Sequence, residues 1–124
     1  MTLSKITSEV SGDDSVVKCI STDTTDKCAN MDPISFSGGM NEAIFKLVRT
    51  VDAIPRSRVT GIGPDFLLVQ FTNKGKKTLD DVEFHLDPDL KLIHFKTSAK
   101  GGNLNFGANQ RRIEEIRNVF QSLR

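Results

Sequence analysis

Residues 80–98 read DDVEFHLDPDLKLIHFKTS, and this stretch decides the fold class. On both sides of Pro88 and Asp89, apolar and polar residues alternate with the two-residue period of a strand that buries one face. Pro88 has the fixed φ angle that suits the first central position of a tight turn. The stretch therefore predicts a β-hairpin with one apolar and one polar face.

We expect Pro88 and Asp89 to be the two turn residues of this hairpin, and that choice sets its register. The cross-strand pairs then predicted on the polar face are Asp87 with Leu90, His85 with Leu92, Glu83 with His94, and Asp81 with Lys96. On the apolar face, the predicted pairs are Phe84 with Ile93 and Val82 with Phe95. This register places apolar against apolar and pairs opposite charges, as stable cross-strand pairs require.

Helical periodicity appears on either side of the strand-forming region. The segment SGGMNEAIFKLVRTVDAIP, residues 37–55, carries one apolar stripe made of Ile44, Leu47, Val48, Val51 and Ile54. We expect Ser37 to cap this helix and Pro55 to end it. A second helix is predicted from about Ala108, with the stripe Ile113, Ile116, Phe120 and Leu123.

Two further strands are predicted between the first helix and the hairpin, at residues 57–63 and 65–73. The expected fold is α+β, with an antiparallel four-stranded meander sheet and two helices on one face, in the order α-β-β-β-β-α. Residues 1–32 are rich in Ser, Thr and Asp, and we interpret them as an irregular N-terminal tail. Residues 33–124 then form a single α+β domain.

Bulk composition excludes some classes of function. The 124 residues carry 17 basic and 16 acidic side chains, so the net charge of +1 argues against a nucleic-acid partner. No apolar run approaches the roughly 18 residues that a membrane span needs. The first residues lack the apolar region of a secretory signal, so the sequence as written predicts a cytoplasmic protein, or an exported or lumenal one if a leader was removed.

The polar face of the predicted hairpin gathers candidate chemical groups. Asp81, Glu83, His85 and His94 share this face, and two carboxylates with two imidazoles form a candidate metal site or acid–base pair. The alternative is a solvated sheet face with ordinary ion pairs, which is common in antiparallel sheets. Nothing matches the fixed ligand spacing of a zincin or zinc knuckle, and we expect neither a resident metal nor a cofactor.

The second candidate region is FKTSAKGGNLNFGANQRRIEEIR, residues 95–117, where a strand passes through glycines into a basic helix. The predicted anion-binding residues of this junction are Lys96, Lys100, Gly102, Gly107, Asn109, Arg111 and Arg112. Backbone N–H groups at a helix start can hold an anion, but a structural turn that joins strand to helix is the favoured explanation of the glycines. We also expect Lys96, Lys100, Asn109 and Arg112 to converge into one polar cluster with Asp81, Glu83 and His94.

The motifs LDDVEFHLD and IHFKTSAKGGNLNFGANQRRIEEIR together resemble the bacterial and plant family catalogued as domain of unknown function 1499. In the second motif, Gly102, Gly107, Asn109 and Arg112 fit the family pattern, whereas Lys96 and other positions depart from it, as in a divergent member. The resemblance spans about residues 33–122 and implies no established activity.

The resemblance also bears on the two cysteines. The family tends to carry two cysteines near its N-terminus, and Cys19 and Cys28 occupy the corresponding region. The resemblance implies a disulfide between them, and two free thiols in a reducing compartment are the alternative.

Three classes of function remain open from the sequence. The favoured one is a small non-catalytic binding or accessory module with an anion-binding cluster at residues 96–112, whose partner is a small anion or a protein. The alternatives are a metal-dependent or acid–base enzyme that uses Asp81, Glu83, His85 and His94, and a structural protein-interaction module.

Overall fold

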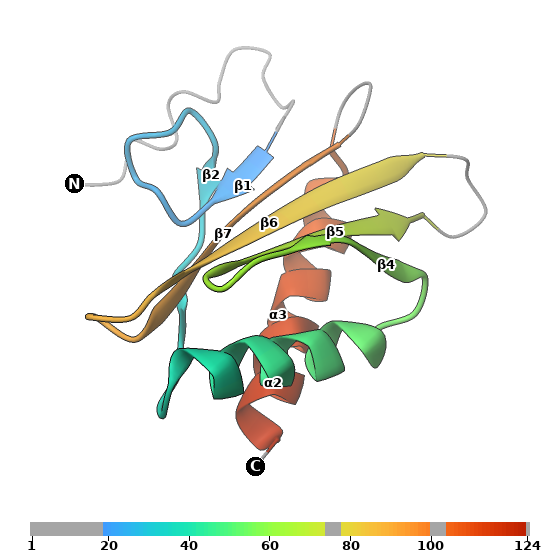
Figure 1. Cartoon of the computed structure of the whole chain (residues 1–124). Helices are drawn as coiled ribbons and strands as arrows, with labels where there is room; N and C mark the ends of the chain where they lie inside the picture. Colours follow the sequence, from blue (N-terminus) through green and yellow to red (C-terminus); the bar gives the residue numbers. More distant parts are fainter. Residues whose placement is uncertain (1–18, 74–77, 100–103, 124) are drawn as a thin grey trace.

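A computed structural model describes residues 19–73, 78–99 and 104–123 of the chain. Its central feature is a meander of four antiparallel strands, shown in Figure 1. They are β4 (Ser57–Ile62), β5 (Phe66–Thr72), β6 (Leu79–Asp87) and β7 (Leu92–Ala99). Each strand pairs with the next one along the chain, because the short connections favour antiparallel neighbours.

The expectation of only four strands was wrong, because the segment before residue 36 adds three short ones. They are β1 (Cys19–Ser21), β2 (Ala29–Asn30) and β3 (Ile34–Ser35). Strands β1 and β3 pair antiparallel to β7, while β2 pairs parallel to β1, so the seven-stranded sheet is mixed. Strands of two or three residues are too short to show an alternating pattern, which is why the sequence suggested an irregular tail here.

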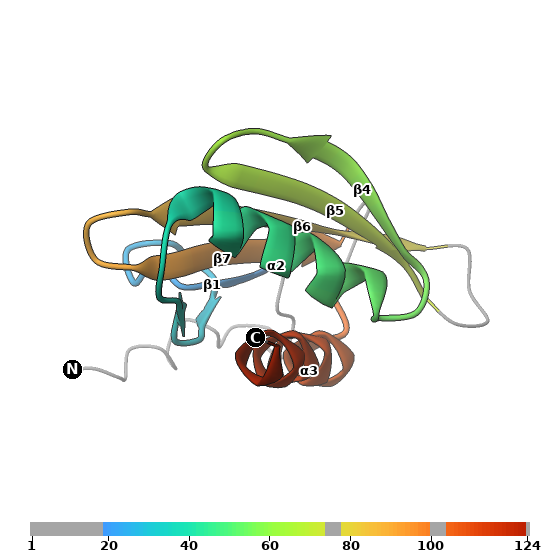
Figure 2. The same ribbon diagram turned by 60° about the horizontal axis from the view of Figure 1, so that its bottom comes forward.

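Two helices, α2 (Met40–Asp52) and α3 (Phe106–Ser122), pack on the same face of the sheet, as Figure 2 shows. Helix α2 begins after Gly39, not after the predicted cap Ser37, and the Glu42 carboxylate accepts the Gly39 N–H at 3.0 Å. Helix α3 begins two residues before the predicted start, because the Asn105 side chain caps it by accepting the Ala108 N–H at 3.0 Å. In the described part of the chain, no helix is long and apolar enough to span a bilayer.

The core lies between the helices and the sheet. The predicted stripes supply it: Ile44, Leu47, Val51, Ile54, Ile113, Ile116 and Phe120 are all buried. The sheet contributes alternate residues of its strands, among them Leu67, Val69, Phe71, Val82, Phe84, Ile93 and Phe95. The apolar face of the hairpin is therefore the face that the helices cover.

The predicted hairpin register was wrong by two residues. His85 pairs with His94 and Glu83 pairs with Lys96, instead of with Leu92 and His94 respectively. A two-residue hairpin turn needs a positive φ at its first central position, which proline cannot adopt. The chain instead forms a four-residue loop in which Lys91, with a φ of 58°, donates its N–H to the Asp87 carbonyl at 2.9 Å.

The shift by two residues leaves the assignment of side chains to the two faces intact, because the side-chain period of a strand is also two. Asp81, Glu83, His85, His94 and Lys96 alternate with the buried residues of β6 and β7, so they lie on the face away from the helices, which we call the open face. No described helix covers this face. The sequence therefore predicted the face of each hairpin residue correctly and its cross-strand partner incorrectly.

Candidate functional site

A buried ion pair joins the start of β6 to α3. The Arg112 Nη1 atom lies 3.1 Å from Oδ2 of Asp80, and the side chains are 14% and 3% exposed respectively. The same nitrogen donates to Oδ1 of Asn109 at 2.9 Å. A buried carboxylate is costly unless it is paired and hydrogen-bonded, and this arrangement provides both.

Asn109 is the second member of this network and is almost completely buried. Its Nδ2 donates to Oδ2 of Asp80 at 3.2 Å and to the Asn105 carbonyl at 2.9 Å. Its Oδ1 accepts from the Thr97 hydroxyl of β7 at 3.2 Å. One amide side chain therefore ties two strands to the first turn of α3.

The rest of the Arg112 guanidinium is also occupied. Its Nη2 donates to Oδ1 of Asn73 at 3.2 Å, and the group lies 4.4 Å above the centroid of the Phe71 ring. Hydrogen bonds and a cation–π contact thus surround a cation whose charge Asp80 balances. We call Asp80, Asn109 and Arg112 the polar lock, since their groups satisfy one another inside the fold.

The acidic member of this cluster is Asp80, not Asp81 or Glu83 as the sequence suggested. The period of two along β6 places Asp80 with Val82 on the helix-covered face, and it places Asp81 and Glu83 on the open face. Arg112 projects from a helix that packs on the covered face, so only Asp80 lies on its side. His94 likewise lies on the open face and does not join the lock.

The predicted anion-binding residues are not gathered at one point. Asn109 and Arg112 belong to the polar lock, whereas Lys96 lies on the opposite face of the sheet. Arg111 is exposed on α3, and Gly107 lies in its first turn, where an added Cβ would meet only ordinary contacts. Lys100 and Gly102 lie outside the described residues. The junction at 96–112 thus separates into a buried part and an exposed part.

The histidines of the open face are cross-strand neighbours with different partners. His94 Nδ1 lies 3.0 Å from the Thr22 hydroxyl, and His85 Nε2 lies 3.4 Å from Oε1 of Glu83. In the described segments, no three side chains of the metal-ligating types come together in a way that could hold one ion. The four residues proposed for a metal site or acid–base pair therefore share a face without forming a metal cluster.

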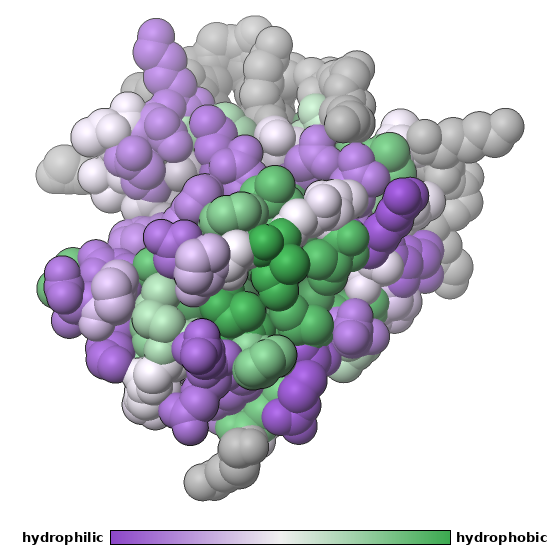
Figure 3. Space-filling model, in the orientation of Figure 1, coloured by the Kyte–Doolittle hydropathy of each residue, from purple (hydrophilic) through white to green (hydrophobic). Residues whose placement is uncertain are grey.

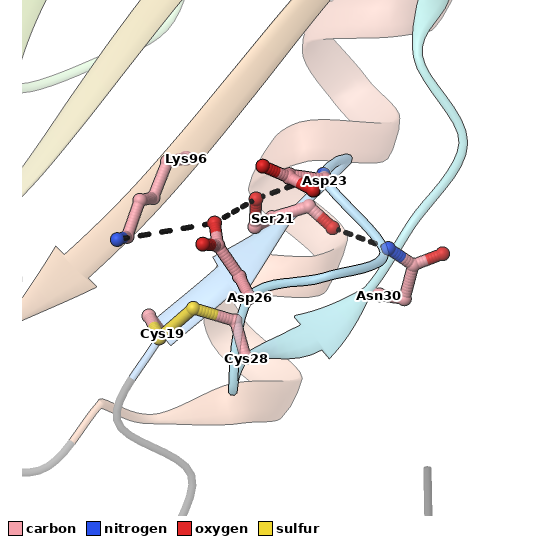
Figure 4. Close-up of a disulfide and its surroundings, with 7 residues drawn as sticks. All are labelled: Cys19, Ser21, Asp23, Asp26, Cys28, Asn30 and Lys96. Atoms are coloured by element: carbon pink, nitrogen blue, oxygen red, sulfur yellow. Dashed lines mark hydrogen bonds and ion pairs between the residues drawn. A yellow bond between two sulfur atoms is a disulfide. The ribbon is translucent and has the colours of Figure 1, made fainter. Parts of the chain in front are cut away.

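A disulfide between Cys19 and Cys28 closes the loop that joins β1 to β2 (Figure 4). Their Cα atoms lie 4.8 Å apart. Within the loop, the Ser21 hydroxyl donates to Oδ2 of Asp26 at 2.8 Å, and Nζ of Lys96 lies 3.9 Å from the same oxygen. We call residues 19–28 the disulfide loop; it lies against the β7 side of the open face.

The electrostatics of the disulfide loop follow from these contacts. Hydrogen bonds from the Thr25 hydroxyl and then from its backbone N–H hold the pKa of Asp23 below its usual value of 3.8. Electrostatic interactions with His94 and Lys96 also lower this pKa. The carboxylate of Asp23 is thus stabilised in its charged form at the edge of the open face.

The sequence did not predict the remaining members of the polar lock, nor the partners of His94 and Lys96 in the disulfide loop. Asp80, Thr97 and Asn73 were not assigned to the lock, and Thr22 and Asp26 were placed in an irregular tail. One signal was present, because the alternation of β6 already placed Asp80 on the apolar face, where an acid needs a partner. The contacts of Thr22 and Asp26 had no local signal, since they join positions about 70 residues apart.

The comparison with protein families agrees with the two motifs described above. The model of a family described as a protein of unknown function (DUF1499) matches residues 9–120. The chain belongs to the DUF1499 family. No curated protein and no solved structure matches it. The match covers both the disulfide loop and the polar lock of this DUF1499 protein.

Proposed function

We propose that this DUF1499 protein is a small non-catalytic binding or accessory module that presents the open face of its sheet to a ligand. The observation that carries the proposal is the one-sided arrangement of the fold. Helices α2 and α3 occupy one face, while Glu83, His85 and Lys96 project from the other with side chains 55%, 61% and 45% exposed. A rigid sheet that displays polar side chains is a suitable platform for recognition.

The roles of the charged groups support binding over catalysis. Arg112 is committed to Asp80, so the polar lock stabilises the fold and has no free cation for a substrate. Among the described residues of the junction 96–112, the anion contact then falls to Lys96, whose exposed side chain lies on the open face. Lys96 lies 3.9 Å from Asp26, a separation at which an exposed pair is weak enough for an anion to compete.

We further propose that the protein works in an oxidising compartment. The disulfide between Cys19 and Cys28 supports this, because such bonds form and persist in extracellular, periplasmic or lumenal environments and are rare in reducing ones. The disulfide loop contacts Lys96 through Asp26 and His94 through Thr22. An oxidising compartment would therefore preserve these contacts at the edge of the open face.

Thermal unfolding in the presence of ligands tests the proposal. The panel would contain phosphate, citrate and sugar phosphates, then Zn²⁺, Mn²⁺ and Mg²⁺, and then neutral metabolites. A ligand present at 100 times its Kd stabilises the folded state by about 2.7 kcal/mol. We expect stabilisation by an anion or metabolite. Stabilisation by a metal alone would favour the enzyme alternative, and no response would favour a structural interaction module.

Two matched variants locate the contact. Lys96→Gln removes an exposed cation from the open face, and Arg111→Gln removes one from α3 on the other side of the sheet. We expect the stabilisation by an anion to disappear in the first variant and to persist in the second. The reverse result would place the ligand at the start of α3 and would contradict the open face as the binding surface.

A further inference from the structure

The strand β4 has a neighbour on one side only in the described part of the chain, because it stands last in the order of the sheet. The carbonyl of Arg56 accepts the Thr72 N–H, and the Gly63 N–H donates to the Phe66 carbonyl, both at 3.0 Å. Hydrogen-bonding direction alternates along an antiparallel strand. The backbone groups of Ser57, Val59 and Ile62 therefore point away from β5.

Apolar surface lies beside this edge. The Ile62 side chain is 55% exposed, and that of Phe45 on α2 is 68% exposed. Val59 and Val48, one from each element, are half-buried against the core. Figure 3 shows a hydrophobic area over this side of the molecule, where β4 and α2 lie. Exposed apolar surface next to unpaired strand edges is a feature of sites that accept an added strand.

The charges at this edge indicate what kind of segment would bind. Arg56 and Arg58 are exposed at the start of β4, and neither pairs with a carboxylate among the described residues. Residues 57–62 contain no carboxylate, so a second copy of the chain paired edge to edge would offer Arg58 no opposite charge. An acidic residue in the added strand would instead form a favourable cross-strand pair with Arg58.

The bulge in β4 limits the length of the paired segment. The register with β5 shifts between Val59 and Gly61, so the strand bends there. Such a bend discourages long, flat edge pairing between copies but leaves the outward groups on both sides of it accessible. A short extended segment is therefore the occupant that the geometry accepts.

We propose that the edge of β4, together with the adjoining apolar surface of α2, binds an extended acidic segment of a partner protein as an added β-strand. The side chains of this segment that face the helix layer are apolar, and those that face the open side include a carboxylate beside Arg58. This surface differs from the open face, so the inference does not depend on the function proposed above.

The test uses the wild-type protein and a synthetic probe, the capped hexapeptide Glu-Val-Glu-Val-Glu-Val, with binding followed by fluorescence anisotropy. Two control peptides separate the contributions. One carries N-methyl groups on alternate backbone nitrogens, and the other replaces each Glu with Lys. We expect both to bind at least about tenfold more weakly, the loss that two backbone hydrogen bonds or a reversed charge pair would cause.

Two variants and a map of the bound surface complete the test. Arg58→Glu should reverse the preference between the acidic and basic peptides, whereas Arg111→Glu, on α3, should leave it unchanged. Amide NMR shifts should concentrate on residues 57–62. The proposal is overturned by equal binding of the N-methylated peptide, by shifts confined to β6 and β7, or by absence of binding at about 1 mM peptide.

Discussion

Replacing Arg112 with alanine should lower the free energy of unfolding by about 3 kcal/mol. The change removes a guanidinium that donates to Asp80, Asn109 and Asn73 and that lies on the ring of Phe71. It leaves the Asp80 carboxylate, only 3% exposed, with an amide as its remaining described donor. Loss of one partner of a fully buried pair costs about 3–5 kcal/mol, and the 14% exposure of Arg112 favours the lower end of that range.

Urea or thermal unfolding followed by circular dichroism measures this loss. For 124 residues, the entropy of unfolding is about 0.26 kcal/mol/K, so 3 kcal/mol corresponds to a fall in Tm of about 11 °C. Arg111→Ala is the matched control, because it removes the adjacent but exposed cation of the same helix. Its effect should stay within about 0.5 kcal/mol.

A double-mutant cycle distinguishes the ion pair from general packing. Asp80→Asn keeps the shape of the side chain and removes its charge, and it should couple to Arg112→Ala by about 2 kcal/mol. Additive effects of the two changes, or an effect of Arg112→Ala no larger than that of Arg111→Ala, would refute the predicted coupling. Either result would mean that the lock contributes little to the stability of the fold.

Three other expectations test the remaining features. Replacing both cysteines of the disulfide with serine should lower the free energy of unfolding by about 2.5 kcal/mol in a chain-entropy estimate, and reduction of the wild-type protein should match it in denaturant titrations. Because the pKa of Asp23 lies below 3.8, its contribution to stability is present above that pH and is lost as the pH falls through the lowered value. Thr25→Val should move this pKa back toward 3.8 in an NMR titration, and an unchanged pKa would contradict the assigned hydrogen bond. Gly63→Ala should destabilise by about 1–3 kcal/mol, since the added Cβ would overlap the ring of Phe66, whereas Gly107→Ala should stabilise the helix by about 0.5–1 kcal/mol. Equal effects of the two glycine changes in thermal unfolding would refute this distinction.

The candidate site was only partly accessible from the sequence. The sequence predicted that Asn109 and Arg112, at the junction between β7 and α3, belong to one polar cluster. The structure brings these two side chains together. Their acidic partner was misassigned, because Asp80 and Asp81 are adjacent and differ only in the face toward which they point. Choosing between them requires knowing where α3 packs, and no local pattern provides this.

The sequence by itself determined the α+β class, the two helical stripes and the faces of β6 and β7, because each depends on a period that a few neighbouring residues display. The tertiary structure alone decided the pairing of β1 and β3 with β7. It also decided that Arg112 meets Asp80, which precedes it by 32 positions. These features depend on contacts between residues far apart in the chain, whose energies become favourable only when the whole sheet and both helices are assembled.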